Sequence, residues 1–339
     1  MQLTVDGKTV EAKKGQSLRE LVCGLGLDRE QLSQRPLAAR IAGEVFTLNY
    51  IPLRDKDGEG DRPSMRRAMA ASGGNIRLLR IKDSAGRDVY VRTGQFVVFL
   101  ALRQLWPEAV STMDCTLGSS VFISVTGAKD FSVSRLKAQV EQIVAQDIPL
   151  LRHRAKKEEA IARFAAEGQG DKARLLQWRS LEYCSEYSYG DYTDNFYGEM
   201  APSTGYLSVW DILPADGGFL FVYPDELEPD RPAKLSPMPQ FFSVFTEGER
   251  WCRLMNCENV ADLNELTASG KIRELIRVNE ALHEKRFSQV ADMVCSRGAK
   301  AVLLAGPSSS GKTTSAHRLA TQLRVYGKKP ILMSLDDYY

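Results

Sequence analysis

The stretch Ala301-Val302-Leu303-Leu304-Ala305-Gly306-Pro307-Ser308-Ser309-Ser310-Gly311-Lys312-Thr313-Thr314 decides the fold class expected near the end of this chain. It begins with a continuous apolar run, which is typical of a strand buried on both faces. Two glycines then enclose four residues and are followed by lysine and threonine, the pattern of a phosphate-binding loop. The helix expected over residues 314–324 adds its positive end. The stretch therefore predicts the start of an α/β nucleotide-binding domain.

A nucleoside triphosphate with magnesium is the ligand that this loop pattern predicts. Lys312 is expected to neutralise the outer phosphates, and Thr313 to supply a hydroxyl ligand for a Mg²⁺ ion that bridges them. The alternative is a glycine-rich turn that binds nothing. The residues predicted to contact the nucleotide are Gly306, Ser308, Ser309, Ser310, Gly311, Lys312, Thr313 and Thr314.

A second apolar run, residues 331–334, predicts another buried strand and is followed by Asp336 and Asp337. Ligands of open parallel sheets bind at the carboxyl ends of the strands. Either aspartate is therefore placed to accept a proton from an attacking hydroxyl group. The alternative is a solvated turn that happens to hold two aspartates.

The loop followed by Ser334-Leu335-Asp336-Asp337-Tyr338-Tyr339 resembles the start of the uridine kinase and phosphoribulokinase family of P-loop NTPases. The resemblance implies that Asp336 is the catalytic base, that Lys312 acts on the transferred phosphate, and that Tyr339 helps to hold the acceptor. It leaves Asp337 as a magnesium-shell or structural residue. The implied activity is transfer of phosphate from ATP, with Mg, to a hydroxyl group of a nucleoside or sugar acceptor. The lack of further strands after Tyr339 leads us to expect a fragment of a longer, active protein.

The front of the chain predicts a small sheet crossed by one helix. Leu3, Val5 and Val10 surround a turn at residues 6–8, which indicates a hairpin. Ser17 is a candidate N-cap for a helix up to Leu25, and a strand is expected over residues 37–41. The charged residues 54–63 indicate a loop or a first boundary.

The middle of the chain predicts a mixed α+β region. The expected helices are 96–105, a longer one from Ser132 or Ser134, and 158–166; the expected strands are 76–81, 89–91, 206–212 and 219–223. Turns are expected at 84–87 and 216–218. Prolines concentrated in 224–239 indicate a connector that leads to further helices ending near Gly298.

These two regions resemble the front of threonyl-tRNA synthetase. Residues 1–62 resemble its TGS domain, a ubiquitin-like β-grasp unit. Residues 63–223 resemble its second additional domain, the editing domain, through the segments 102–107, 194–198 and 202–206. Residues 224–298 then form the connector and helices, and 299–339 the start of the P-loop domain. This order resembles a known group of fused uridine-kinase-like proteins.

The resemblance also points to four positions where the synthetase binds metal in order to hydrolyse mischarged tRNA. In this chain these positions hold Arg92, Phe96, Phe196 and Met200. None of them is a good zinc ligand. We therefore expect that the editing chemistry has been lost and that the fold serves another purpose.

Charge and composition give few signs of a nucleic-acid partner. Lysine and arginine total 45 against 43 acidic residues, so the net charge is only +2. The tyrosines between 183 and 206 predict packing rather than stacking on bases, and the basic run 152–157 predicts a solvated face rather than a contact with RNA phosphates. The alternative function, an RNA- or tRNA-associated regulatory protein with the P-loop as a nucleotide switch, rests on the synthetase resemblance.

Cysteine usage and hydropathy bear on the compartment. The six cysteines are scattered, and no signal peptide precedes them. No apolar run approaches the roughly 20 residues that a membrane-spanning helix needs. We therefore expect a cytoplasmic protein without a membrane partner.

Overall fold

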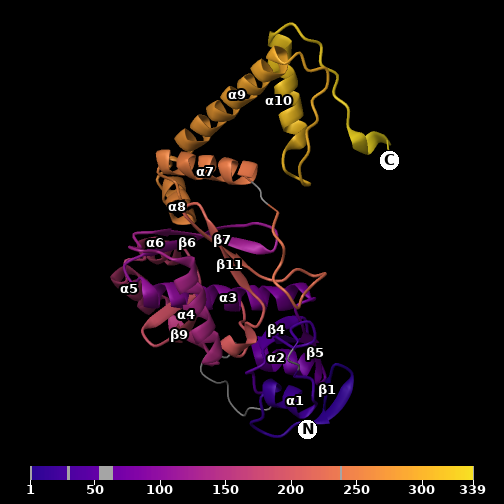
Figure 1. The fold of residues 1–339 in the computed structure, drawn as a ribbon, viewed down its shortest axis with the longest axis vertical. Helices are drawn as coiled ribbons and strands as arrows, with labels where there is room; N and C mark the ends of the chain where they lie inside the picture. The colour runs from indigo at the N-terminus through magenta and orange to yellow at the C-terminus, as the bar shows by residue number, and fades with distance from the viewer. Residues whose placement is uncertain (1, 29–30, 53–63, 237–238, 339) are drawn as a thin grey trace. The chain divides into compact units, whose positions relative to one another are not determined.

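Two compact units make up the chain, Met1–Met238 and Pro239–Tyr339 (Figure 1). The structure is a computed structural model that describes residues 2–28, 31–52, 64–236 and 239–338. The loop predicted over 54–63 lies outside the described residues. The finer division at residues 62, 223 and 298 stays a prediction.

A five-stranded sheet with the order β2-β1-β5-β3-β4 opens the first unit. Its strands are β1 (Gln2–Val5), β2 (Lys8–Glu11), β3 (Ala38–Ile41), β4 (Glu44–Thr47) and β5 (Asn75–Leu79). Only β1 and β5 pair in parallel. Helix α1 (Leu18–Gly24) buries Leu18 and Leu21, and α2 (Ser64–Ala71) precedes β5. The predicted hairpin, helix and strand are confirmed.

Local chemistry explains why these elements form. Asp6 and Gly7 both have positive φ, 47° and 78°, which is the geometry that a tight hairpin between β1 and β2 requires. Ser17 begins α1 with a capping box, in which the Glu20 backbone N–H donates to the Ser17 hydroxyl and the Glu20 carboxylate accepts from the Ser17 backbone.

Helix α3 (Ser84–Leu105) contradicts part of the sequence interpretation. The predicted strand over 89–91 and the predicted turn over 84–87 are wrong, because both segments lie in this helix. Val89 and Tyr90 are buried in the core, so packing of the helix overrides the strand preference of these residues. Strand β5 pairs with β1 and β3. The first sheet therefore includes residues that follow the boundary predicted at residue 62.

An antiparallel sheet with the order β11-β12-β7-β6 packs with α3 and α4. Its elements are β6 (Val110–Thr116), β7 (Ser120–Thr126), α4 (Val133–Ala145), β11 (Asp211–Ala215) and β12 (Gly218–Val222). Gly94 of α3 lies so close to Phe221 that a Cβ there would stand 2.3 Å from the ring. The predicted strand over 206–212 is wrong over residues 206–210, because the 3₁₀ turn η1 (Thr204–Tyr206) ends at its first residue and strand β11 begins only at Asp211.

A separate sheet with the order β10-β9-β8 has its own small core. The elements are β8 (Arg152–Lys156), α5 (Lys157–Ala166), α6 (Gly170–Gln177), β9 (Tyr183–Tyr189) and β10 (Tyr192–Asn195). Phe164 of α5 and Leu176 of α6 pack with Cys184 of β9. One face of β9 is therefore covered by these two helices.

The regular elements that the structure describes in the second unit are all helical, and the stretches 297–311 and 326–334 between them hold no helix or strand. These elements are α7 (Pro239–Leu254), α8 (Val260–Ala268), α9 (Ile272–Ser296), α10 (Lys312–Val325) and the turn η2 (Leu335–Tyr338). Figure 1 shows α9 and α10 side by side, and Ala291, Ala320 and Leu323 are buried in this unit. Glu284 of α9 accepts a hydrogen bond from Gln322 of α10 at 3.0 Å.

The strands predicted over 301–305 and 331–334 do not occur. Leu303 is 93% exposed and Ile331 is 86% exposed. A strand needs a neighbour for its backbone N–H and C=O groups, and the described residues of this unit contain no other strand. The structure therefore shows the mixed α+β part of the predicted fold, with several sheets, but it does not show the predicted P-loop NTPase domain.

Candidate functional site

The predicted phosphate loop, residues 306–314, leads into the start of α10. Gly311 adopts a left-handed conformation, with φ at 81°, directly before the first residue of the helix, Lys312. Ser309 also has a positive φ, 61°. A Cβ on Gly306 would stand 2.8 Å from the Ser310 hydroxyl, so the loop closes tightly where glycine occurs. The backbone thus curls at this end of the helix although the predicted strand before it is absent.

The side chains of this loop fit a phosphate group. The Lys312 ammonium folds back over the loop and donates to the Pro307 carbonyl at 2.8 Å. Thr313 and Thr314 lie in the first turn of α10 and are exposed. The N-terminus of a helix attracts anions through its unpaired N–H groups and its dipole. The loop therefore brings together an ammonium group, a helix N-terminus and the Thr313 hydroxyl.

The predicted catalytic base is not joined to this loop. Asp336 and Asp337 lie in η2, where the Asp337 backbone N–H donates to the Ser334 carbonyl at 3.3 Å. Within the part of the chain that the structure describes, no hydrogen bond or ion pair links either carboxylate to residues 306–314. Tyr339 lies outside the described residues, so its predicted role stays a prediction.

The four positions expected to have lost their metal ligands converge on one place in the first unit. Phe96 of α3 is fully buried, with its ring centroid 6.0 Å from that of Phe196 and 6.5 Å from that of Tyr187. The Met200 backbone N–H donates to the Tyr187 hydroxyl at 3.2 Å. We call Arg92, Phe96, Tyr187, Phe196 and Met200 the aromatic cluster.

Arg92 completes the aromatic cluster as a packed cation. Its Nη1 donates to the Glu199 carbonyl at 2.5 Å. A Cβ on Gly198 would stand 2.9 Å from the guanidinium carbon, so glycine leaves the space that the arginine fills. Burial lowers the pKa of Arg92 from its usual value. A guanidinium in this place offers only donors, which a metal cation cannot use.

A buried ion pair borders the aromatic cluster. Arg152 of β8 donates to the Glu199 carboxylate at 2.7 Å, and the two side chains are only 10% and 2% exposed. Burial raises the pKa of the neighbouring Tyr187 hydroxyl above its usual value. Among the described residues, no group of histidine, cysteine, aspartate or glutamate side chains is arranged to hold a metal ion.

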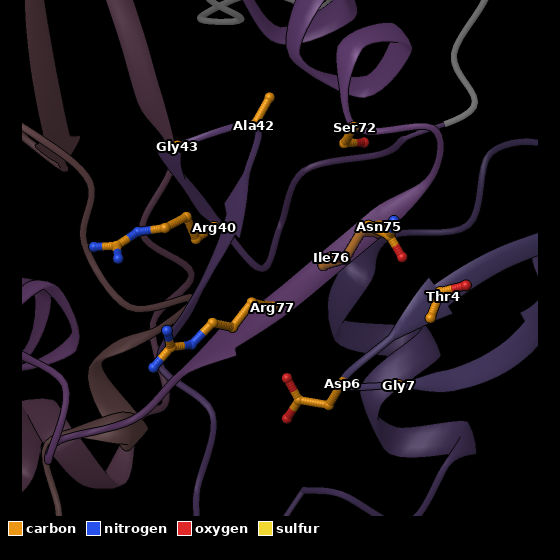
Figure 2. A pocket seen from close by; sticks show the side chains of 10 residues that line it. All are labelled: Thr4, Asp6, Gly7, Arg40, Ala42, Gly43, Ser72, Asn75, Ile76 and Arg77. Carbon is orange, nitrogen blue, oxygen red and sulfur yellow. The ribbon is translucent and has the colours of Figure 1, made fainter.

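An open pocket of about 510 Å³ lies on the first sheet. Figure 2 shows Arg40 of β3 and Arg77 of β5 extending in the same direction along its wall, and the two residues are direct partners in the β3–β5 register. The Asp6 carboxylate accepts a hydrogen bond from the Arg80 guanidinium at 2.9 Å. The Arg77 guanidinium donates a hydrogen bond to the Asp83 carboxylate at 2.7 Å. Asp6 and Arg77 therefore have partners of opposite charge, whereas the buried Nε of Arg40 has no hydrogen-bond partner among the described residues.

A pairing of arginines with tyrosines is the feature that the sequence did not predict. The Arg154 guanidinium lies 4.3 Å from the centre of the Tyr183 ring, and that of Arg179 lies 4.7 Å from the Tyr197 ring. The predicted packing role holds for Tyr187 and Tyr206, which are buried, but Tyr183 and Tyr197 are exposed. The period-two pattern of β8 and β9 shows which residues of each strand share a face, but the pairing of Arg154 with Tyr183 also depends on the register between the two strands.

The proteins similar to this chain are threonine–tRNA ligases. No family model matches the chain. The ligase of Symbiobacterium thermophilum is 26% identical over 218 residues, which cover 63% of this chain and 30% of the ligase. That of Acetivibrio thermocellus is 26% identical over 220 residues, covering 63% and 31%, and that of Clostridium kluyveri 22% over 218 residues, again covering 63% and 31%.

These similarities support a TGS- and editing-like region and correct the predicted activity. The mixed α+β fold with several sheets fits the N-terminal region of threonyl-tRNA synthetase. The predicted nucleoside kinase, a phosphotransferase, is contradicted, because the relatives are ligases that act on tRNA. The chain spans less than a third of the length of these relatives, so their similarity does not extend to a whole ligase. Among the described residues, no helix is long and apolar enough to cross a membrane.

Proposed function

We propose that this protein associates with tRNA or a similar RNA through its first unit, without the hydrolytic editing reaction, and binds a nucleotide at the phosphate loop. The observation that carries the proposal is the similarity to threonine–tRNA ligases over 63% of the chain, together with the aromatic cluster at the positions implied for metal. A fold kept with its sheets and core, but without metal ligands, supports binding rather than hydrolysis.

The phosphate loop supports nucleotide binding as a second part of the proposal. ATP is held through Lys312 and the loop residues Gly306, Ser308, Ser309, Ser310, Gly311 and Thr314. Thr313 is the side chain that would hold Mg²⁺, which neutralises phosphate charge when it is bound. Among the described residues, no catalytic base is linked to the loop. The proposed role of the nucleotide is therefore to change the affinity for RNA rather than to donate a phosphate group.

The low net charge limits the size of the RNA contact. A charge of +2 cannot hold RNA by a general positive field, so a local group of basic residues must do so. Each phosphate that such a group neutralises releases counterions, and the affinity then falls as salt is added. The binding must therefore depend on salt but with a shallow slope.

Two titrations of the full chain test this proposal. Fluorescence anisotropy with labelled total tRNA, at about 50 and 200 mM salt, should show saturable binding that weakens with salt. Calorimetry with ATP and Mg²⁺ should show binding that Lys312→Ala abolishes, with Lys300→Ala as a matched control on the exposed stretch before the loop. If no tRNA binds at either salt concentration, the RNA part of the proposal is wrong. If Lys312→Ala binds ATP like the parent chain, the nucleotide part is wrong.

The switch itself has a separate signature. Because coupling between two ligands is reciprocal, ATP must change the affinity for tRNA by the same factor as tRNA changes that for ATP. Such couplings are typically about 5- to 150-fold. Equal tRNA affinities with and without saturating ATP would leave two independent binding sites and remove the switch.

A further inference from the structure

Helix α7 ends in a Schellman motif that carries two cysteines. Asn256 has a φ of 49°, the left-handed conformation in which many helices end. The Asn256 backbone N–H donates to the Arg253 carbonyl at 3.0 Å, and the Cys257 backbone N–H donates to the Cys252 carbonyl at 3.0 Å. These two hydrogen bonds and the left-handed residue together define the motif. Cys252 and Cys257 therefore stand at its two ends.

The motif brings the two cysteine side chains together although they are five positions apart in the chain. Side chains at the two ends of a Schellman motif frequently contact each other. With standard bond lengths on either side, the hydrogen bond from Cys257 to Cys252 keeps their Cα atoms less than about 7 Å apart even if it is fully extended. The bend of the turn shortens that separation further. Disulfides join cysteines whose Cα atoms lie about 4.4–6.8 Å apart, so the backbone of this turn suits a disulfide.

The electrostatics and exposure of the two thiols agree with this placement. Burial, the Asp262 carboxylate and the Cys252 sulfur raise the pKa of the Cys257 thiol, so the two sulfur atoms are close enough to interact. Both thiols are free; Cys252 is exposed and Cys257 is half-buried. An oxidant in solution therefore meets the Cys252 sulfur first and leaves Cys257 beside it as the resolving thiol.

The turn between the two cysteines is already ordered on both sides. Trp251, the residue before Cys252, donates from its indole Nε1 to the Asn279 side chain of α9 at 2.9 Å. Asn259, two residues after Cys257, begins α8 with a capping box. Because the chain is held before and after the turn, closing a bond between the two sulfur atoms orders few further residues.

We propose that Cys252 and Cys257 form a reversible intramolecular disulfide when the protein meets hydrogen peroxide. The site lies in the second unit and needs neither RNA nor a nucleotide, so this inference goes beyond the proposed function. In the oxidised form a covalent bond closes the end of α7. In the reduced form only the hydrogen bonds of the turn hold Asn256 in its left-handed conformation.

The oxidation consumes one peroxide and takes place in two steps. The Cys252 thiolate attacks one peroxide oxygen; an S–O bond forms, the O–O bond breaks, and the other oxygen leaves as hydroxide, which takes up a proton to give water. The Cys257 thiolate then attacks the sulfur of the Cys252 sulfenic acid. The S–S bond forms, the S–O bond breaks, and the hydroxyl group leaves and is protonated to a second water. The two thiol protons end in the waters, the sulfur atoms lose two electrons and the peroxide gains them.

Peptide mapping of the full chain without reductant tests the link directly. Trypsin cuts after Arg250, Arg253 and Lys271, so the two cysteines fall in different peptides, 251–253 and 254–271. After treatment with hydrogen peroxide and unfolding, these two peptides should be recovered as one joined species. Dithiothreitol should separate them again, because thiol exchange reverses a disulfide.

Two cysteine variants identify the partners in the link. Cys252→Ser should abolish the joined species. Cys295→Ser is the matched control, because it removes a half-buried thiol of α9 in the same unit, and it should leave the yield of the joined species unchanged. Circular dichroism checks that each variant keeps the helical content of the parent chain.

Two substitutions of Asn256 test whether the turn positions the thiols. Asn256→Gly keeps the left-handed conformation without a steric cost and should form the link at the rate of the parent chain. Asn256→Val places a β-branched side chain where φ is positive. It should form the link roughly 5- to 30-fold more slowly, as expected from the cost of a left-handed residue.

The outcomes decide the inference without reference to the binding experiments. A joined species in the parent chain that Cys252→Ser lacks supports it. A sulfinic acid on Cys252 with no joined species, or a link from Cys252 to a second chain, would overturn it. Equal rates in the two Asn256 variants would show that the turn does not position the thiols and would overturn it as well. The proposed binding of RNA and nucleotide stands or falls on its own titrations.

Discussion

The buried pair of Arg152 and Glu199 tests how the first unit keeps its editing-like fold. Arg152→Met removes the cation that donates to the buried Glu199 carboxylate, which is 2% exposed, and Glu199→Leu removes the anion that the Arg152 guanidinium, 10% exposed, contacts. Removing one partner of a buried pair costs about 3–5 kcal/mol. Replacing both partners by apolar side chains is often neutral. We expect the double variant to be destabilised less than either single variant.

Urea unfolding of the full chain, followed by circular dichroism, measures these differences. With slopes of about 1–3 kcal/mol/M, each single change should lower the unfolding midpoint by about 1 M or more. Arg231→Met is the control, because its pair with Glu228 is about half exposed on both sides and is worth less than about 1 kcal/mol. Costs that simply add in the double variant would show that the two buried side chains do not act as a pair.

Three further changes test separate parts of the first unit. Gly86→Ala should destabilise the chain by about 1–3 kcal/mol, because its Cβ would stand 2.0 Å from a backbone carbonyl oxygen, whereas Gly24→Ala meets no atom within 4 Å and serves as its control in thermal unfolding. Ser17→Ala should cost about 1 kcal/mol in urea unfolding by removing the capping box. Burial raises the pKa of Glu186, so the folded chain binds that proton more tightly and stability falls as pH rises from 4.5 through the raised pKa. Glu186→Gln should flatten that fall in a series of urea midpoints against pH, and an unchanged slope would contradict it.

Elements set by their own residues could be predicted from the sequence. The hairpin at Asp6 and Gly7 needs positive φ angles that these residues tolerate, and the start of α1 needs the hydroxyl and carboxylate that Ser17 and Glu20 supply. The start of α4 was predicted at Ser132 or Ser134 for the same reason, and the structure places its N-cap at Ser132. Each signal lies within a few residues and does not depend on the rest of the fold.

Elements set by distant contacts could not be predicted in this way. Residues 89–91 have strand-forming side chains, but the core that they bury belongs to a helix. The apolar run 301–305 has the composition of a buried strand, yet a strand also needs a paired neighbour, and the described residues of its unit provide none. Composition gives the preference of a segment, and tertiary pairing decides whether that preference is realised.

The pairing of Arg154 with Tyr183 depends on distant contacts in the same way. The sequence showed basic residues over 152–157 and tyrosines from 183 onward, with no basic residue between the tyrosines of 187–197. The two sets are interleaved across the sheet rather than along the chain, because β8 pairs with β9. Knowledge of the strand register, which a single sequence does not contain, was needed to bring Arg154 to the ring of Tyr183.

Strand β9 links the aromatic cluster, which lies at the positions implied for metal, to the surface of the first unit. Tyr187, inside β9, is buried against Phe96 and next to Arg152 and Glu199, while Tyr183, the first residue of the strand, is exposed. Packed aromatic rings fill a site more rigidly than an empty set of metal ligands would, because tightly packed side chains have few alternative positions. The aromatic cluster therefore holds the strand in place, and the strand in turn presents the exposed tyrosine. The proposed association with RNA without hydrolysis is compatible with this arrangement, since the buried residues and the exposed ones belong to the same strand but to different positions along it.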